Sequence, residues 1–252
     1  MKGCNMIFIT GDTHSDWMSR FSSDAFPEGK TLSKDDYVIV CGDFGLWHDT
    51  KEERYHLKWL EQKPFTTLFV CGNHENYDRL YKYPVEEWHG GKIHKISDSV
   101  YHLMRGQVFE IEENLFFTFG GASSHDIRDG ILEKDDERIS KWYKEFRQFR
   151  INHVSWWQEE LPSKEEMEEG INNLKRYHNK VDFIITHSPC TSVLKQMDAG
   201  AGLFHADRLT DYLQKIKENT EYSKWFFGHM HVNENIPWEK SIAIFEQIIR
   251  IA

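Results

Sequence analysis

Short apolar runs, each closed by a glycine or a histidine, recur along the chain. They are rich in β-branched or aromatic residues, which is typical of strands buried on both faces. The five clearest runs cover residues 7–10, 37–41, 67–71, 183–186 and 225–227. In sheets covered by helices, ligand sites gather outside the carboxyl ends of the strands. We therefore expect the polar residues that follow these runs to lie near one another.

Helical periodicity is found in two later segments of the chain. Ser163 and Glu166 have the spacing of a capping box, in which two side chains satisfy free backbone N–H groups at the start of a helix. Both segments then carry apolar residues at helical intervals, which predicts amphipathic helices that cover a sheet. These residues are Met167, Ile171 and Leu174 in the first segment, and Leu209, Tyr212, Leu213 and Ile216 in the second.

The middle and the end of the chain predict a second sheet. Residues 101–109 and 115–119 flank the polar Glu112-Glu113-Asn114 in the manner of a β-hairpin. Residues 241–252 are again mostly apolar and predict closing strands for this sheet. The expected fold class is α/β, a four-layer α-β-β-α sandwich with two mixed β-sheets flanked by helices. Residues 1–252 are expected to form a single domain.

A charged segment near residues 123–150 interrupts this regular pattern. It lies between an apolar run that ends in Gly120-Gly121 and the aromatic pair Trp156-Trp157. The favoured interpretation is a solvated helix with balanced charges. Because the segment follows a predicted strand end, the alternative is an insertion that serves as a lid or specificity element.

Composition and charge narrow the range of functions. The formal net charge of −10 weighs against a broad basic face for nucleic acid, although a local basic channel stays open. No stretch is long and apolar enough to span a bilayer, so we expect no membrane association. The cysteines occur singly, without a C-x-x-C pair, which favours a reducing cytoplasm. They are Cys4, Cys41, Cys71 and Cys190.

Polar motifs directly follow the five predicted strands. They are Gly11-Asp12-Thr13-His14, Gly42-Asp43, Gly72-Asn73-His74-Glu75, Thr186-His187 and Gly228-His229-Met230-His231. Asp carboxylates, neutral imidazoles and an Asn carbonyl are the oxygen and nitrogen ligands that borderline divalent ions prefer. Each fragment alone is a weak signal, because Gly, Asp and Asn are also common turn residues. Their ordered occurrence at strand ends predicts a metal cluster.

The ordered motifs resemble those of the calcineurin-like metallophosphoesterase family, and the resemblance extends from Gly11 to His231. It implies that His74 donates a proton to the leaving oxygen or stabilises it, a role that suits an imidazole near neutral pH. It also implies the metal ligands. Asp12, His14 and His231 would hold one ion, Asn73, His187 and His229 would hold a second, and Asp43 would bridge the two.

The expected reaction follows from that pair of ions. Two divalent ions about 3.5–4 Å apart share a water, lower its pKa and hold a phosphate for in-line attack. We therefore expect hydrolysis of a phosphate mono- or diester in a small phosphorylated substrate by a metal-bridging hydroxide. Mn, Fe, Zn and Ni all suit the ligand set. Two alternatives stay open: a nuclease or nucleotide-specific phosphodiesterase, which the acidic composition disfavours, and a catalytically silent metal-binding scaffold.

The chain departs from the family pattern in two places. Ser15 follows His14 where many members have glycine. The run after Asp43 lacks the Asp-Arg pair of the phosphoprotein phosphatases, so both the carboxylate that orients His74 and a bidentate phosphate clamp are missing. This argues against protein phosphatase activity. Asp49 is a candidate to orient His74, and His125 and Arg128 are candidates to bind phosphate.

Overall fold

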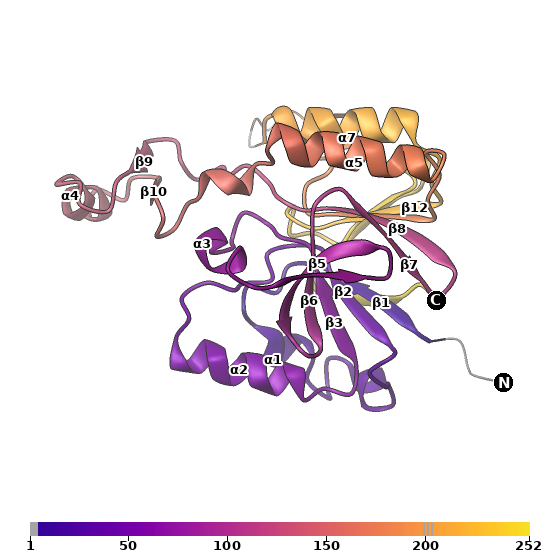
Figure 1. Cartoon of the computed structure of the whole chain (residues 1–252). Helices are drawn as coiled ribbons and strands as arrows, with labels where there is room; N and C mark the ends of the chain where they lie inside the picture. Colours follow the sequence, from indigo (N-terminus) through magenta and orange to yellow (C-terminus); the bar gives the residue numbers. More distant parts are fainter. Residues whose placement is uncertain (1–4, 199, 201, 203) are drawn as a thin grey trace.

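Two β-sheets packed face to face, with helices on their outer sides, make up the body of the molecule (Figure 1). The computed structural model describes residues 5–198, 200, 202 and 204–252, so Cys4 lies outside the described residues. Cys41, Cys71 and Cys190 are buried and unpaired. No helix within these described ranges is long and apolar enough to cross a lipid bilayer.

The first sheet has the strand order β15-β1-β2-β3-β6-β5-β4. Strands β1, β2, β3 and β6 run parallel, and every residue of β1, β2 and β3 is buried, as the apolar runs predicted. The strands of this sheet are β1 (Ile7–Thr10), β2 (Tyr37–Val40), β3 (Thr66–Phe69), β4 (Val85–Trp88), β5 (Gly91–Ser97), β6 (Val100–Leu103) and β15 (Ile248–Arg250).

The second sheet has the order β13-β14-β12-β11-β8-β7. Its centre is parallel, and the β7–β8 hairpin makes one edge antiparallel. Both sheets are therefore mixed, as expected for this fold class. The strands of this sheet are β7 (Gln107–Ile111), β8 (Asn114–Phe119), β11 (Phe183–Thr186), β12 (Lys224–Phe227), β13 (Glu234–Ile236) and β14 (Ser241–Ala243).

Three hydrophobic cores hold these layers together. One lies between the first sheet and helices α1 (Trp17–Arg20) and α2 (Lys51–Glu61), and a second lies between the two sheets. The third lies between the second sheet and helices α5 (Lys164–Arg176) and α7 (Arg208–Asn219). The capping box of Ser163 and Glu166 begins α5 as predicted. Short helices α3 (Tyr77–Leu80) and α6 (Thr191–Asp198) complete the body.

Two strand predictions were wrong in detail. Residues 101–109 do not form one arm of a hairpin, because the chain turns at Gly106, whose φ is +72°, and passes from β6 in the first sheet to β7 in the second. Residues 241–252 do not all join the second sheet either. Strand β14 does, whereas β15 pairs antiparallel with β1 at the edge of the first sheet. The C-terminal run therefore belongs to both sheets.

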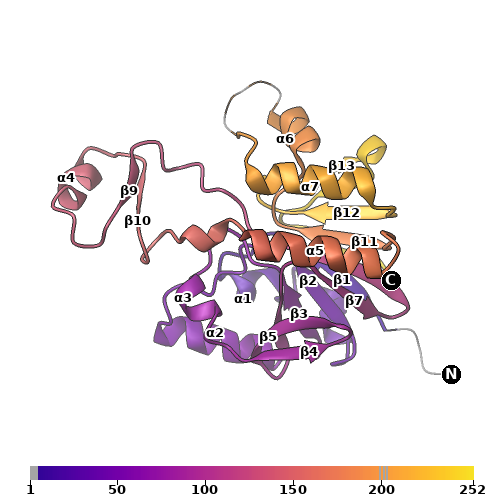
Figure 2. The ribbon, with the colours of Figure 1, turned by 45° about the horizontal axis from the view of Figure 1, so that its top comes forward.

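Much of the charged segment extends away from the two sheets (Figure 2). It is not one solvated helix, since it contains the short helix α4 (Ile139–Lys144) between two three-residue strands. These strands, β9 (Gly130–Leu132) and β10 (Phe149–Ile151), pair in parallel and form a separate small sheet. At the base of the segment, buried Glu160 accepts hydrogen bonds from the backbone N–H and hydroxyl of Ser124.

Candidate metal centre

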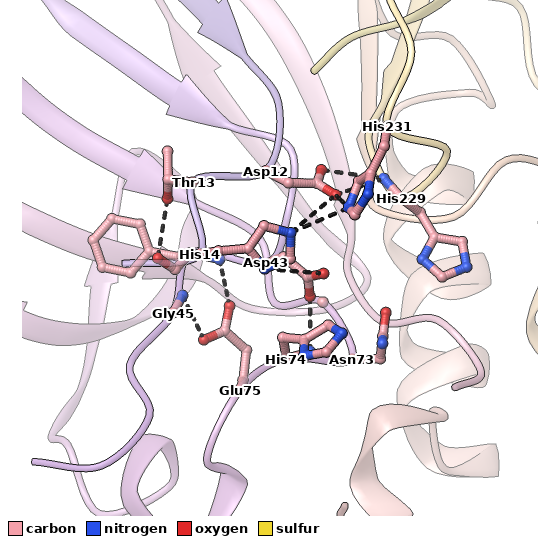
Figure 3. Close-up of polar contacts among 12 residues, drawn as sticks. Asp12, Thr13, His14, Asp43, Gly45, Asn73, His74, Glu75, His229 and His231 are labelled. Carbon is pink, nitrogen blue, oxygen red and sulfur yellow. Dashed lines mark hydrogen bonds and ion pairs between the residues drawn. The ribbon is translucent and has the colours of Figure 1, made fainter. Parts of the chain in front are cut away.

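The polar motifs of both sheets converge at one point, where the carboxyl ends of their parallel strands face each other (Figure 3). The first sheet supplies Asp12 after β1, Asp43 after β2 and Asn73 after β3. The second sheet supplies His187 after β11, and His229 and His231 after β12. Residues more than 200 positions apart in the chain thereby come into contact, as in the hydrogen bonds from the His229 N–H to the Asp12 carboxylate.

Four of the predicted ligands form a compact cluster at the solvent-facing side of this point. Asp12, His14, Asp43 and His231 each offer one ligand atom, and these atoms lie within 4.8 Å of one another. Nε2 of His231 is 3.1 Å from Oδ2 of Asp12 and 3.1 Å from Nε2 of His14. A divalent cation fits this set, because two carboxylates and two imidazole nitrogens are directed at one small volume.

The other predicted ligands lie on the buried side of Asp43. Nδ1 of His187 donates a hydrogen bond to the carbonyl oxygen of Cys41 at 2.8 Å, which leaves Nε2 as the coordinating nitrogen. That Nε2 atom is 3.3 Å from Oδ1 of Asn73 and 3.4 Å from Oδ1 of Asp43. The imidazole of His229 lies further out, with its ring centroid 5.0 Å from that of His187. A neutral imidazole held in this way is a suitable metal ligand.

The protonation equilibria at this centre favour a cation. Burial alone would raise the pKa of Asp43, but the adjacent His187 outweighs it and holds that pKa well below its usual range. Burial opposes a charge on His187 as well, yet the Asp43 and Asp12 carboxylates raise its pKa to about 9. Buried carboxylates therefore hold a positive charge between them, and a metal ion can take the place of that proton.

Glycines let the strand ends approach closely enough for these contacts. A Cβ atom on Gly72 would lie 2.0 Å from Oδ1 of Asp43, and one on Gly228 would lie 2.1 Å from Oδ1 of Asp12. No side chain fits in either place, which explains why a glycine precedes the ligand in these motifs. The backbone is also unusual at the ligands themselves, because His14, Asp43, His229 and His231 all have positive φ angles. Such conformations concentrate at functional sites.

Glu75 is a positioning residue that sequence reasoning missed. Its carboxylate is fully buried and accepts hydrogen bonds from the backbone N–H groups of Phe44, Gly45 and Leu46, at 2.7, 3.1 and 3.1 Å. These bonds fix the loop that follows Asp43 (Figure 3). The signal was present in the sequence, since Glu75 ends the Gly-Asn-His-Glu motif, but its neighbours in space are not its neighbours in the chain.

His74 borders the four-residue cluster. Its backbone N–H donates to Oδ1 of Asp43 at 2.8 Å, and its ring lies 5.2 Å from the His14 ring and 5.6 Å from the Trp47 ring. Burial lowers the pKa of His74, although the Asp43 carboxylate opposes this shift. Asp49 does not orient this ring, because its carboxylate forms ion pairs with Arg54 and Arg79 instead. The rings of His14 and Trp47 thus flank the imidazole of His74.

The two candidate phosphate binders lie on the opposite flank. His125 and Arg128 line a cavity that also reaches His229, and the rings of His125 and His229 are 5.9 Å apart. Asp126 forms a bidentate ion pair with Arg150 of β10, which ties the start of the charged segment to its end. The base of the segment therefore borders the metal centre, whereas its tip does not.

Two sheets that meet at a cluster of carboxylates and imidazoles form a candidate metal site. The family model described as calcineurin-like phosphoesterase matches residues 6–233. The chain therefore belongs to the calcineurin-like phosphoesterase family, as the motifs predicted, and membership supports metal-dependent phosphoesterase activity.

Comparisons with individual proteins give distant similarities to solved structures. No curated protein matches the chain. Among solved structures, the phosphopantetheinyl hydrolase from Mycobacterium tuberculosis is similar with 15% identity and a TM-score of 0.45, over 97% of this chain and 89% of that chain. A protein of unknown function from Aquifex aeolicus shows 18% identity and a TM-score of 0.28, over 62% of this chain and 82% of that chain.

Proposed function

We propose that the chain is a binuclear metallophosphoesterase that hydrolyses a phosphate mono- or diester in a small substrate. In this proposal Asp12, His14, Asp43 and His231 surround one divalent ion, and Asp43, Asn73, His187 and His229 surround a second. Mn, Fe, Zn and Ni all suit these oxygen and nitrogen donors, so the metal available to the protein decides between them.

The observation that carries the proposal is the position of the Asp43 carboxylate. One of its oxygens, Oδ2, is 3.9 Å from Nδ1 of His14, and the other, Oδ1, is 3.4 Å from Nε2 of His187. Each oxygen therefore faces one of the two groups of ligands. A carboxylate that is shared in this way is what a pair of neighbouring ions requires.

The chemistry divides between the ions and the protein. Two bound divalent ions would lower the pKa of a water molecule and polarise the phosphate for in-line displacement. Asp43 fixes the spacing of the two groups of ligands, and Glu75 fixes the loop that carries Asp43. His74 then supplies a proton to the leaving oxygen, a task suited to an imidazole in a partly buried position.

The proposal also covers the charged segment beside the site. Residues 123–150 act as an insertion on a single domain, with a base that borders the substrate and serves as a specificity element.

The substrate class and the location of the protein complete the proposal. The natural substrate is a small phosphorylated molecule rather than nucleic acid or a membrane, in keeping with a net charge of −10. We place the protein in the cytoplasm, since Cys41, Cys71 and Cys190 are unpaired.

The proposal is tested with p-nitrophenyl phosphate and bis-p-nitrophenyl phosphate after addition of Mn²⁺, Ni²⁺, Zn²⁺ or Fe²⁺, with the metal content of each sample measured in parallel. We expect two ions per chain and hydrolysis of at least one ester with at least one metal. Bound metal without turnover of any ester in a broad panel would instead indicate a catalytically silent scaffold. Selective cleavage of single-stranded nucleic acid would favour the nuclease alternative.

A further inference from the structure

Two separate cavities border the candidate metal centre, one next to His14 and the other next to His229. The first is a groove of about 560 Å³, and its lining includes His14 and His74. The second is a cavity of about 510 Å³, and its lining includes His229. Apart from these histidines, the groove is formed by the loops after β1 and β2 and the start of α2. The cavity is formed by the base of the charged segment, by residues after β11 and in α6, and by described residues just before and at the start of α7. A phosphate at the centre would thus have room for a substituent on either side.

The groove suits a flat group without negative charge. Trp47 is half-buried there, and its ring packs edge-on against that of Trp157 at 5.4 Å. The backbone N–H of Trp47 donates to the buried Glu53, which also pairs with Arg79, so the aromatic wall is held in place. No lysine or arginine occurs among the described residues that line the groove. Its titratable groups are the imidazoles of four histidines, among them His48 and His56, and the carboxylates of Asp16, Glu52 and Glu53. The groove therefore favours an uncharged substituent over an anionic one.

The cavity differs from the groove in having an arginine. Arg128 and His125 are exposed on its wall, and His205 also lines it. Its two acidic groups are already engaged: Asp126 pairs with Arg150, and Asp207 accepts the backbone N–H groups of Leu209 and Thr210. The guanidinium of Arg128 is thus the charged group left to bind a substituent, which favours an anionic or hydroxyl-rich one.

We propose that the site acts on phosphodiesters with two unlike arms, a flat uncharged arm held by Trp47 in the groove and a polar or anionic arm held by His125 and Arg128 in the cavity. This inference rests on the proposed phosphoesterase function and names its substrate class. A monoester would fill only one of the two spaces, and a diester with two anionic arms would place one of them beside Asp16 and Glu52.

The position of His74 sets the direction of cleavage. A water oxygen forms the new bond to phosphorus and loses one proton to solvent, while the bond from phosphorus to the oxygen of the groove arm breaks. The electron pair of that bond stays on the departing oxygen, which takes a proton from His74, and solvent then restores the proton of His74. His74 lines the groove and not the cavity. The products are therefore the alcohol of the groove arm and a phosphomonoester of the cavity arm.

The test compares the p-nitrophenyl diester of 3-phosphoglycerate, whose second arm is anionic, with p-nitrophenyl phosphate on the Mn²⁺-loaded protein. We expect kcat/KM for the diester to exceed that for the monoester by at least about tenfold, since stacking and anion contacts each contribute to binding. Trp47→Ala and Arg128→Ala should each raise KM for the diester about tenfold with a smaller change in kcat. The matched controls are Trp238→Ala and Arg138→Ala, whose side chains are 71% and 56% exposed and line neither cavity.

Binding of the product 3-phosphoglycerate to the Mn²⁺-loaded protein gives a second readout, which calorimetry measures separately from hydrolysis of the diester. Arg128→Ala should weaken this binding about tenfold, and Trp47→Ala should leave it unchanged, because this product carries the cavity arm alone. Equal hydrolysis of both esters, with KM and product binding unaffected by either variant, would overturn the two-armed substrate and leave the phosphoesterase function intact. Failure of the metal-loaded protein to hydrolyse any ester would overturn the function itself.

Discussion

The two sides of the candidate metal centre differ in how the protein holds them. On the buried side, the His187 side chain is fully buried and donates to the Cys41 carbonyl. On the outer side, the side chains of His14 and His231 are 34% and 51% exposed. Their ring nitrogens contact each other and the Asp12 and Asp43 carboxylates. The buried side is therefore fixed by the packing of the fold, whereas the outer side is open to solvent.

The largest effect is expected from the residue that both sides share. Asp43→Ala removes the carboxylate that faces His14 and His187, so the variant should lose both ions and all measurable turnover. Metal analysis after gel filtration, together with ester hydrolysis, measures this. Asp24→Ala, at an exposed position, is the control. An Asp43→Ala protein that keeps a full complement of two ions would show that this carboxylate does not bridge them.

Loss of His74 separates catalysis from metal binding. His74→Ala should retain both ions but slow hydrolysis by roughly 10²–10⁴-fold, the usual contribution of a positioned proton donor. The loss should be larger for a phenyl ester than for a p-nitrophenyl ester, because the poorer leaving group depends more on protonation. Comparison of kcat for the two esters measures this. If His74→Ala lost the metals as well, the residue would be a ligand rather than a proton donor.

The contrast between the two sides predicts different costs for their histidines in the metal-free protein. His187→Ala leaves the buried Asp12 and Asp43 carboxylates without their charged partner, and should lower the free energy of unfolding by about 3 kcal/mol. His14→Ala, at the exposed position, should change it by less than about 0.5 kcal/mol. Urea unfolding with chelator present measures both. Equal destabilisation by the two variants would contradict the difference between the buried and the outer side of the metal centre.

A smaller effect concerns a second buried carboxylate, whose pKa moves in the opposite direction to that of Asp43. Burial raises the pKa of Glu160 to about 7, even though Ser124 donates two hydrogen bonds to it. The folded protein therefore holds a proton that the unfolded chain releases above about pH 4.3, so stability falls as pH rises from there to about 7. Glu160→Gln should remove the part of this slope that Glu160 contributes, which is of order 1–3 kcal/mol, and leave the part that comes from Glu75, whose pKa burial raises to about 8. Unfolding at pH 5 and pH 8 measures it, and an unchanged slope would contradict the buried location.

The sequence predicted the parts of the structure that depend on local pattern. The apolar runs before Asp12, Asp43, Asn73 and His187 are strands, and the capping box of Ser163 begins a helix. The glycines that precede the ligands are also visible in the sequence. The structure adds the reason for them, because it shows which atoms a side chain at each glycine would clash with. The metal ligands came from the ordered motifs and the family resemblance, and their roles stay predictions until ions are observed.

Other features depend on contacts that no local pattern records. Because the chain turns at Gly106, one apolar run contributes strands to both sheets. Strand β15, which was expected in the second sheet, pairs in the first. The ring of Trp47 contacts those of His74 and Trp157, and Glu75 accepts hydrogen bonds from the loop after Asp43, so residues far apart in the chain come together. The charged segment is the extreme case, because its short strands β9 and β10 pair with each other in a separate sheet of two strands.

The central claim is that the strand ends of two sheets hold two divalent ions that share Asp43. Anomalous scattering from crystals grown with Mn²⁺ tests it most directly. The account predicts two peaks about 3.5–4 Å apart, one among Asp12, His14, Asp43 and His231, and the other among Asp43, Asn73, His187 and His229. A single peak at full Mn²⁺ saturation, or two peaks without Asp43 between them, would contradict it.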